Sequence, residues 1–199
     1  MKNVKGSNIH ILFLVVMFVV LTGCSSSSSI SDPLNYEVKD FEFENQDGEI
    51  VSLNSLKGDI WLADFIFTNC DTVCPPMTAH MKELQNMIEA EGLEVKVISF
   101  SVDPENDTPD KIKEFASNYS INFNKWDFLT GYDQSVIEEF ALKNFKVIVQ
   151  KPKESEQVIH TSNFFLIDQN GVVMKDYSGV TDTPYDQIIS DIKVLNSQE

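Results

Sequence analysis

Three patterns in the amino-acid sequence predict an α/β fold. A strand–helix–strand unit occupies residues 60–102, a β-hairpin followed by a helix occupies 163–195, and another hairpin precedes both at 41–53. A strand–helix–strand unit followed by a hairpin and a helix is the thioredoxin arrangement. We therefore predict a thioredoxin-like fold with an additional N-terminal β-hairpin. The sequence indicates neither an internal repeat nor a second folded domain.

The first predicted elements are a hairpin and a buried strand. "FEFEN" and "EIVSL" alternate in polarity, and Asp47-Gly48 between them is a favoured hairpin turn. "IWLADFIF" at 60–67 is nearly continuous in apolar character and lies between a glycine and a cysteine-containing loop. This pattern is typical of a central strand that is covered on both faces.

A helix and a second buried strand follow the cysteine loop. Because the residue before a proline avoids the helical region, we expect the regular helix to begin at Pro75. Residues 77–91 place four apolar side chains on one face of this helix, namely Met77, Met81, Leu84 and Ile88. "VKVISFSV" at 95–102 then predicts a second buried strand.

The remaining elements are predicted from capping signals and alternation. Thr108 is the expected cap and Pro109 the first residue of the next helix. Residues 133–143 form a further helix, and "NFFLIDQNGVVMKDY" at 163–177 forms a hairpin. "TPYDQIISDIKVL" at 183–195 is predicted to be a capped C-terminal helix.

The N-terminal residues have the layout of a secretory signal. Lys2 and Lys5 precede an apolar run at 11–21 that is too short to cross a bilayer comfortably, and "LTGC" ends at Cys24. "LTGC" resembles the bacterial lipobox, which implies lipidation of Cys24; an uncleaved anchor is the alternative. We predict a signal peptide at 1–23, a serine-rich lipidated tether at 24–35 and a folded domain at 36–199.

The composition narrows the range of partners. The chain carries 15 basic and 31 acidic residues, a formal charge of −16, and none of the basic residues is an arginine. Such acidity argues against nucleic acid as a ligand and against electrostatic attachment to anionic lipid.

Cys70 and Cys74, at the junction of a central strand and a helix, admit three interpretations. A structural bridge across so short a loop would constrain little chain entropy. A redox couple would depart from C-x-x-C by one residue, and a metal site would need another ligand. Because the N-terminal end of a helix favours thiolate, either chemistry benefits from this position.

Two histidines follow the cysteines and are candidates for a further ligand. His80 falls between apolar positions of the first helix, which favours a surface or edge position. His160 lies just before a core strand, in a loop that packs over the cysteine loop in thioredoxin-like folds. Ser162 stands where those sequences usually have a cis proline, which leaves room for a ligand, although a histidine of purely structural role is the alternative.

Three segments together carry a family resemblance: "FTNCDTVCPPMTAHM", "SFSVDPENDTP" and "VIHTSNFFLIDQNG". They resemble the Sco/SenC family of copper-binding assembly factors for cytochrome c oxidase, over nearly all of the chain that follows the signal. The resemblance implies that Cys70, Cys74 and His160 bind one copper ion, Cu(I) or Cu(II), per chain. It also implies a role in delivering copper to, or preparing the thiols of, the binuclear copper site in oxidase subunit II. A monomer on the extracytoplasmic face of the cell membrane is expected.

Two thiolates and an imidazole suit copper on chemical grounds as well. Asp103 is a candidate for orienting His160 or tuning the sulfurs, with a turn role as its alternative. Met77 and Met81 are soft donors whose helical spacing favours core packing.

Two other functions are weighed against copper binding. The first is a membrane-anchored thiol–disulfide oxidoreductase that acts without copper, which would leave His160 without a task. The second is a peroxiredoxin-like peroxidase, which is disfavoured because such enzymes use an arginine and this chain has none.

Overall fold

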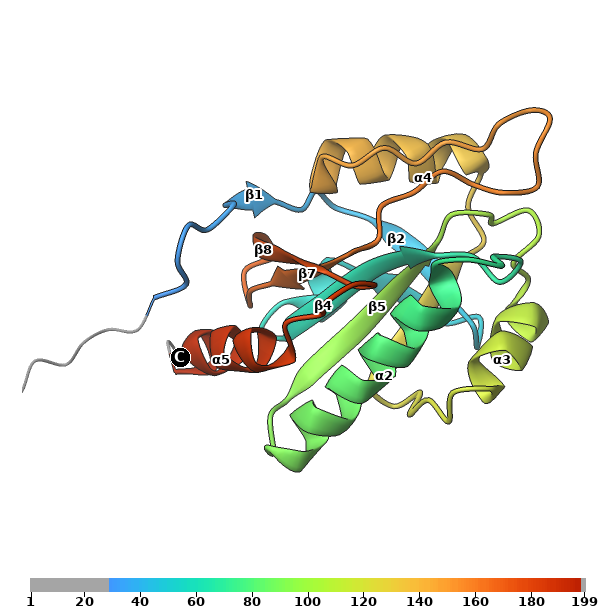
Figure 1. The fold of residues 1–199 in the computed structure, drawn as a ribbon. Coiled ribbons are helices and arrows are strands. Elements are labelled where there is room, and N and C mark those ends of the chain that lie inside the picture. Colours follow the sequence, from blue (N-terminus) through green and yellow to red (C-terminus); the bar gives the residue numbers. More distant parts are fainter. Residues whose placement is uncertain (1–28, 198–199) are drawn as a thin grey trace, which may run out of the picture.

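The computed structural model describes residues 29–197 and contains one mixed sheet of eight strands in the order β1-β8-β7-β4-β5-β6-β2-β3 (Figure 1). The strands are β1 (Tyr36–Glu37), β2 (Glu42–Asn45), β3 (Ile50–Ser52), β4 (Ile60–Ile66), β5 (Val95–Ser101), β6 (Trp126–Thr130), β7 (Asn163–Ile167) and β8 (Val172–Ser178). The central strands β4, β5 and β6 run parallel, and antiparallel strands flank them on both sides.

Residues 29–197 also contain four α-helices and two short helical turns. They are η1 (Asn54–Leu56), α2 (Cys74–Ala90), α3 (Pro109–Ser117), α4 (Gln134–Phe140), the π-helical turn η2 (Ala141–Phe145) and α5 (Tyr185–Asn196). Helices α2 and α5 contact each other and cover one face of the sheet, whereas α4 lies on the other side (Figure 1). This layered arrangement confirms the predicted thioredoxin-like fold.

The pleat of β4 divides its side chains between the two layers. All seven residues of β4 are buried. The Phe65 ring packs edge-on against Phe145 of η2, with 5.2 Å between the ring centroids. Because successive side chains of a strand point to opposite faces, Asp64 lies on the face covered by α2 and α5. The Asp64 carboxylate thus lies on the same side of the sheet as α2, the helix that follows the cysteine loop.

Most predicted elements are confirmed, with differences at their boundaries. The N-terminal hairpin is present as β2 and β3, and it joins the sheet beside β6. Helix α2 begins at Cys74, one residue before the predicted start. Thr108 caps α3 by accepting a hydrogen bond from the Lys111 backbone N–H. The predicted helix at 133–143 is an α-helix only as far as Phe140, after which the chain widens into η2.

Three features differ from the predictions. Strands β1 and β6 were not predicted, and the expected side-chain cap of α5 is wrong. Pro184 occupies the N-cap position of α5, so Thr183 lies one residue too early to cap it. The Thr183 hydroxyl is buried and has no partner within the described residues.

The predictions for the signal peptide and for lipidation at Cys24 concern residues outside the described range. None of the helices in residues 29–197 combines the length and the apolar character that a membrane crossing requires. The folded part begins before β1, since Ile30 is buried in the core and the Leu34 backbone N–H donates to the Met174 carbonyl at 2.9 Å.

Candidate metal centre

The cysteine loop joins the end of β4 to the first residue of α2. Cys74 is fully buried and Cys70 is 6% exposed. The N-cap residue Val73 offers no side-chain acceptor to the helix. The Cys70 sulfur takes this role, because the Cys74 backbone N–H donates to Cys70 Sγ at 3.3 Å. The first sulfur therefore lies where the N-terminal end of α2 stabilises negative charge.

The two thiols are electrostatically unequal. The hydrogen bond from the Cys74 thiol, aided by His160 and by the backbone N–H groups of Thr72 and Cys74, lowers the pKa of Cys70 to about 3. The Cys70 sulfur in turn holds the proton on Cys74, and together with burial it raises the pKa of that thiol. At neutral pH Cys70 is a thiolate and Cys74 carries the shared proton.

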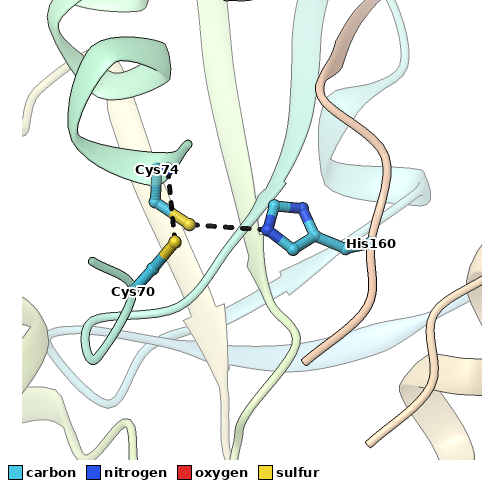
Figure 2. Close-up of side chains that lie close together, drawn as sticks. All are labelled: Cys70, Cys74 and His160. Atoms are coloured by element: carbon cyan, nitrogen blue, oxygen red, sulfur yellow. Dashed lines mark hydrogen bonds between the residues drawn. The ribbon is translucent and has the colours of Figure 1, made fainter. Parts of the chain in front are cut away.

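His160 approaches the sulfurs from the segment that leads into β7 (Figure 2). Its Nε2 lies 3.5 Å from Cys74 Sγ. Its Nδ1 lies 2.7 Å from the Thr161 carbonyl oxygen, and only a protonated Nδ1 can donate to that oxygen. In the neutral ring this contact places the proton on Nδ1 and leaves the lone pair of Nε2 facing the sulfurs, the tautomer that a metal ligand requires.

The three side chains form a compact donor set. Both sulfurs and one imidazole nitrogen lie within 4.8 Å of one another, and both cysteines are free thiols. Two thiolates with an imidazole suit copper or zinc, and three ligands leave a coordination position open to a further donor. The structure thus brings together Cys70, Cys74 and His160, the three residues that the family resemblance implies as ligands.

A buried aspartate in the turn after β5 holds the start of the cysteine loop. The Asp107 carboxylate accepts hydrogen bonds from the Thr68 backbone N–H at 3.1 Å and from the Thr68 hydroxyl at 2.6 Å. The Ser101 hydroxyl donates to the same carboxylate from the end of β5. Three hydrogen bonds on a fully buried carboxylate fix the backbone two residues before Cys70.

The remaining candidate residues lie in other surroundings. Asp103 pairs with Lys151 Nζ at 2.6 Å and accepts from the Asn106 side-chain amide, so its direct partners are in its own turn and in the segment that leads to His160. His80 is half-buried and hydrogen-bonds the Tyr185 hydroxyl, consistent with the edge position that we expected. Met77 and Met81 are fully buried, which confirms their core role.

Asp64 lies near the site and was not predicted from the sequence. Its carboxylate is fully buried, and neither oxygen makes a hydrogen bond within the described residues. Burial raises the pKa of Asp64 to about 7, an effect that Ser99 and His160 partly oppose. The Asp64 charge also helps to raise the pKa of Cys74. The signal for Asp64 was a lone acidic residue within the apolar run "IWLADFIF".

Comparison with known proteins identifies the family. The family model described as SCO1/SenC matches residues 31–196. The SCO1 protein homolog of Bacillus subtilis (strain 168) is 60% identical over 193 residues, which cover 97% of each chain.

Solved structures agree with this match. A SCO1/SenC family lipoprotein from Bacillus anthracis str. Ames has a TM-score of 0.82 and 49% identity, covering 84% of this chain and 99% of its own. BsSco, described as a member of the Sco family of cytochrome c oxidase assembly proteins with a disulfide switch, has a TM-score of 0.81 and 62% identity, covering 86% and 100%. ScoI of Bradyrhizobium japonicum with copper bound has a TM-score of 0.66 and 26% identity, covering 80% and 99%. The chain therefore belongs to the SCO1/SenC family.

Proposed function

We propose that this protein binds one copper ion through Cys70, Cys74 and His160 and acts in the assembly of cytochrome c oxidase, with the binuclear copper site of subunit II as its target. The observation that carries the proposal is the meeting of two sulfurs and an imidazole nitrogen within 4.8 Å. The description of BsSco as an oxidase assembly protein and the copper in the Bradyrhizobium structure support it.

The chain's own residues suit a ligand that must be both held and released. Cys70 is a thiolate before any ion arrives, because its pKa lies near 3, whereas Cys74 must give up its proton on binding. His160 already has the tautomer that offers Nε2. When bound, copper would supply a soft cation that a partner's donor could approach through the open coordination position. Since a disulfide has no free thiolate, binding requires the reduced pair.

A second function has a specific observation in its favour, namely the unequal acidity of the two thiols. In an oxidoreductase that acts without copper, the Cys70 thiolate would attack a partner disulfide and release one partner thiolate. Cys74 would then lose its proton and attack the mixed disulfide at Cys70, which releases the second partner thiol and leaves Cys70 and Cys74 oxidised. This chemistry uses the same two cysteines but does not require the lone pair of His160 Nε2.

The experiment that separates the two functions is the variant His160→Ala, with His80→Ala as the matched control on α2. Reduced protein is titrated with Cu(II) while absorption is followed for a thiolate-to-copper charge-transfer band. We expect His160→Ala to lose this band and more than about 100-fold in Cu(II) affinity, since removal of a direct ligand exceeds the loss of its supporting partners. Disulfide formation should persist, and His80→Ala should match wild type. Wild-type copper affinity in His160→Ala would favour the oxidoreductase.

For location, we propose that residues 1–23 are removed as a signal peptide and that lipid on Cys24 holds the domain at the extracytoplasmic face of the membrane. The relative from Bacillus anthracis is described as a lipoprotein, which supports the proposal. Ile30 is buried in the core, so the folded domain includes this residue. The variant Cys24→Ala should be absent from the membrane fraction and should bind copper with the same affinity as wild type. Retention of this variant in the membrane would contradict lipidation.

A further inference from the structure

The segment that carries His160 has little regular structure of its own. Residues 146–162 run from η2 to β7, and their only backbone ladder within the described residues is an isolated bridge between Gln150 and Ile159. In this bridge each residue donates its N–H to the carbonyl of the other at 2.9 Å. Ile159 directly precedes His160, so the position of the imidazole depends on what holds this bridge in place.

Lys151 follows the other half of the bridge, and its side chain ties the segment to the turn after β5. Its Nζ lies 2.6 Å from Asp103 Oδ1 and 3.2 Å from Glu105 Oε2. The Asp103 side chain is 1% exposed and that of Lys151 is 19% exposed, so the pair is largely shielded from water. Asp103 raises the pKa of the Lys151 ammonium, which keeps it charged at neutral pH. Such a pair is costly to break from one side, because the remaining charge is left buried and unpaired.

The turn that contains Asp103 also holds the cysteine loop. The backbone N–H groups of Asn106 and Asp107 donate to the Asp103 carbonyl at 3.0 and 2.9 Å. The Asp107 side chain, at the end of this turn, accepts the hydrogen bonds from Thr68 described above. The turn at residues 103–107 therefore binds the cysteine loop through Asp107 and the histidine segment through Asp103.

We infer that Lys151 is a positioning residue for His160, which acts by fastening the Gln150–Ile159 bridge to the 103–107 turn so that Nε2 stays within reach of both sulfurs. This inference rests on the proposed copper site and assigns Asp103 an indirect role, through Lys151 rather than through contact with the imidazole. Without the Lys151 ammonium the bridge loses its connection to the turn. His160 then spends part of its time away from the thiols, and binding requires that it be ordered first.

The test compares Lys151→Met with Lys193→Met, which removes an exposed lysine paired with Glu91 at 2.9 Å. In metal-free protein we expect amide hydrogen exchange in residues 148–160 to accelerate by about tenfold or more in Lys151→Met only. In reduced protein we expect Cu(II) affinity to fall by about 10- to 100-fold, the range for residues that support a ligand, with a smaller loss for Cu(I). Lys151→Arg, which keeps the charge, should restore most of both.

Unchanged exchange or unchanged Cu(II) affinity in folded Lys151→Met would overturn the inference. If this variant fails to fold, the double variant Lys151→Met with Asp103→Asn decides, because no unpaired charge is then left buried. We expect the double variant to fold and to show fast exchange and weak Cu(II) binding; wild-type values would contradict the role of Lys151. The two proposals fail separately. Absence of copper binding by wild type would refute the proposed function, whereas the exchange comparison needs no metal.

Discussion

The two arms of the candidate site are held in different ways. The cysteine loop is continuous with β4 on one side and α2 on the other, and the buried Asp107 fixes its first residues. The histidine segment is held by an isolated bridge and by the ion pairs of Lys151 with Asp103 and Glu105. Two hydrogen bonds add to these contacts, from the Lys151 backbone N–H to Glu138 Oε1 and from Gln157 Nε2 to the Asn69 carbonyl, both at 3.0 Å. The acidity of Cys70 is thus largely a local property, whereas the approach of His160 depends on contacts between distant parts of the chain.

The largest effect on stability is expected at Asp64, the buried carboxylate of β4. The pKa of Asp64 is about 7 in the folded protein, against an ordinary value of 3.8. At pH values between these two pKa values, folding is therefore accompanied by uptake of a proton. Stability is therefore highest below about pH 4 with respect to this group, and it falls by roughly 1.4 kcal/mol per unit as the pH rises to about 7. Asp64→Asn abolishes this loss and should be more stable than wild type at pH 8, by up to about 4 kcal/mol.

Urea denaturation at pH 4, 6 and 8 measures this difference. The exposed Asp40→Asn serves as control, since its side chain lies in water. We expect the Asp64→Asn and wild-type curves to approach each other at pH 4 and to separate as the pH rises. A constant difference across the three pH values would mean that Asp64 does not titrate in this window.

The next largest effect on stability is expected from loss of the contacts that hold the cysteine loop. Asp107→Ala removes the acceptor of three hydrogen bonds and leaves the Thr68 N–H and two hydroxyls without their partner. We expect a loss of about 3 kcal/mol in the free energy of unfolding, measured by urea denaturation. The exposed Asp110→Ala, three residues along in α3, should cost less than about 1 kcal/mol. Equal losses for the two variants would show that the Asp107 contacts contribute little.

The same division explains what the sequence could predict. The cysteine loop could be predicted because its signals lie close together in the sequence: an apolar strand, then two cysteines, then two prolines. His160 was recognised by its place before β7 and by the family resemblance. The Lys151–Asp103 pair was not predicted, because it joins residues 48 apart and nothing in the sequence around Lys151 points to Asp103.

Two differences in the fold have equally specific causes. Strand β6 has only five residues and includes the charged Asp127, so its own pattern is weak; its pairing with β5 and β2 stabilises it instead. The Thr-Pro signal was correct at α3, where Pro109 is the first helical residue. It was wrong at α5, where Pro184 itself occupies the N-cap. The dipeptide marks a helix start, but the cap depends on which of its residues enters the helix.

A third prediction compares the two arms through the acidity of Cys70. The Cys74 thiol is the largest cause of the low pKa, and His160 contributes less. Cys74→Ala should therefore raise the Cys70 pKa more than His160→Ala does. At pH 5 we expect alkylation of Cys70 by iodoacetamide to slow by about tenfold or more in Cys74→Ala, equivalent to about 1.4 kcal/mol, with little change at pH 9. A larger effect of His160→Ala would mean that the distant arm controls the thiolate.

The smallest effect is expected where the two arms touch directly. Gln157→Ala removes the hydrogen bond to the Asn69 carbonyl, but Gln157 is exposed and water can replace its amide. We expect less than about 1 kcal/mol in global stability and a two- to fivefold loss of Cu(II) affinity, below that of Lys151→Met. Gln187 is also an exposed residue, and its amide donates to Asp191 at 2.9 Å, so Gln187→Ala controls for loss of a side-chain hydrogen bond away from the site. If Gln157→Ala weakened Cu(II) binding as much as Lys151→Met, the direct link would hold His160 in place, and the buried ion pair would no longer distinguish the two arms.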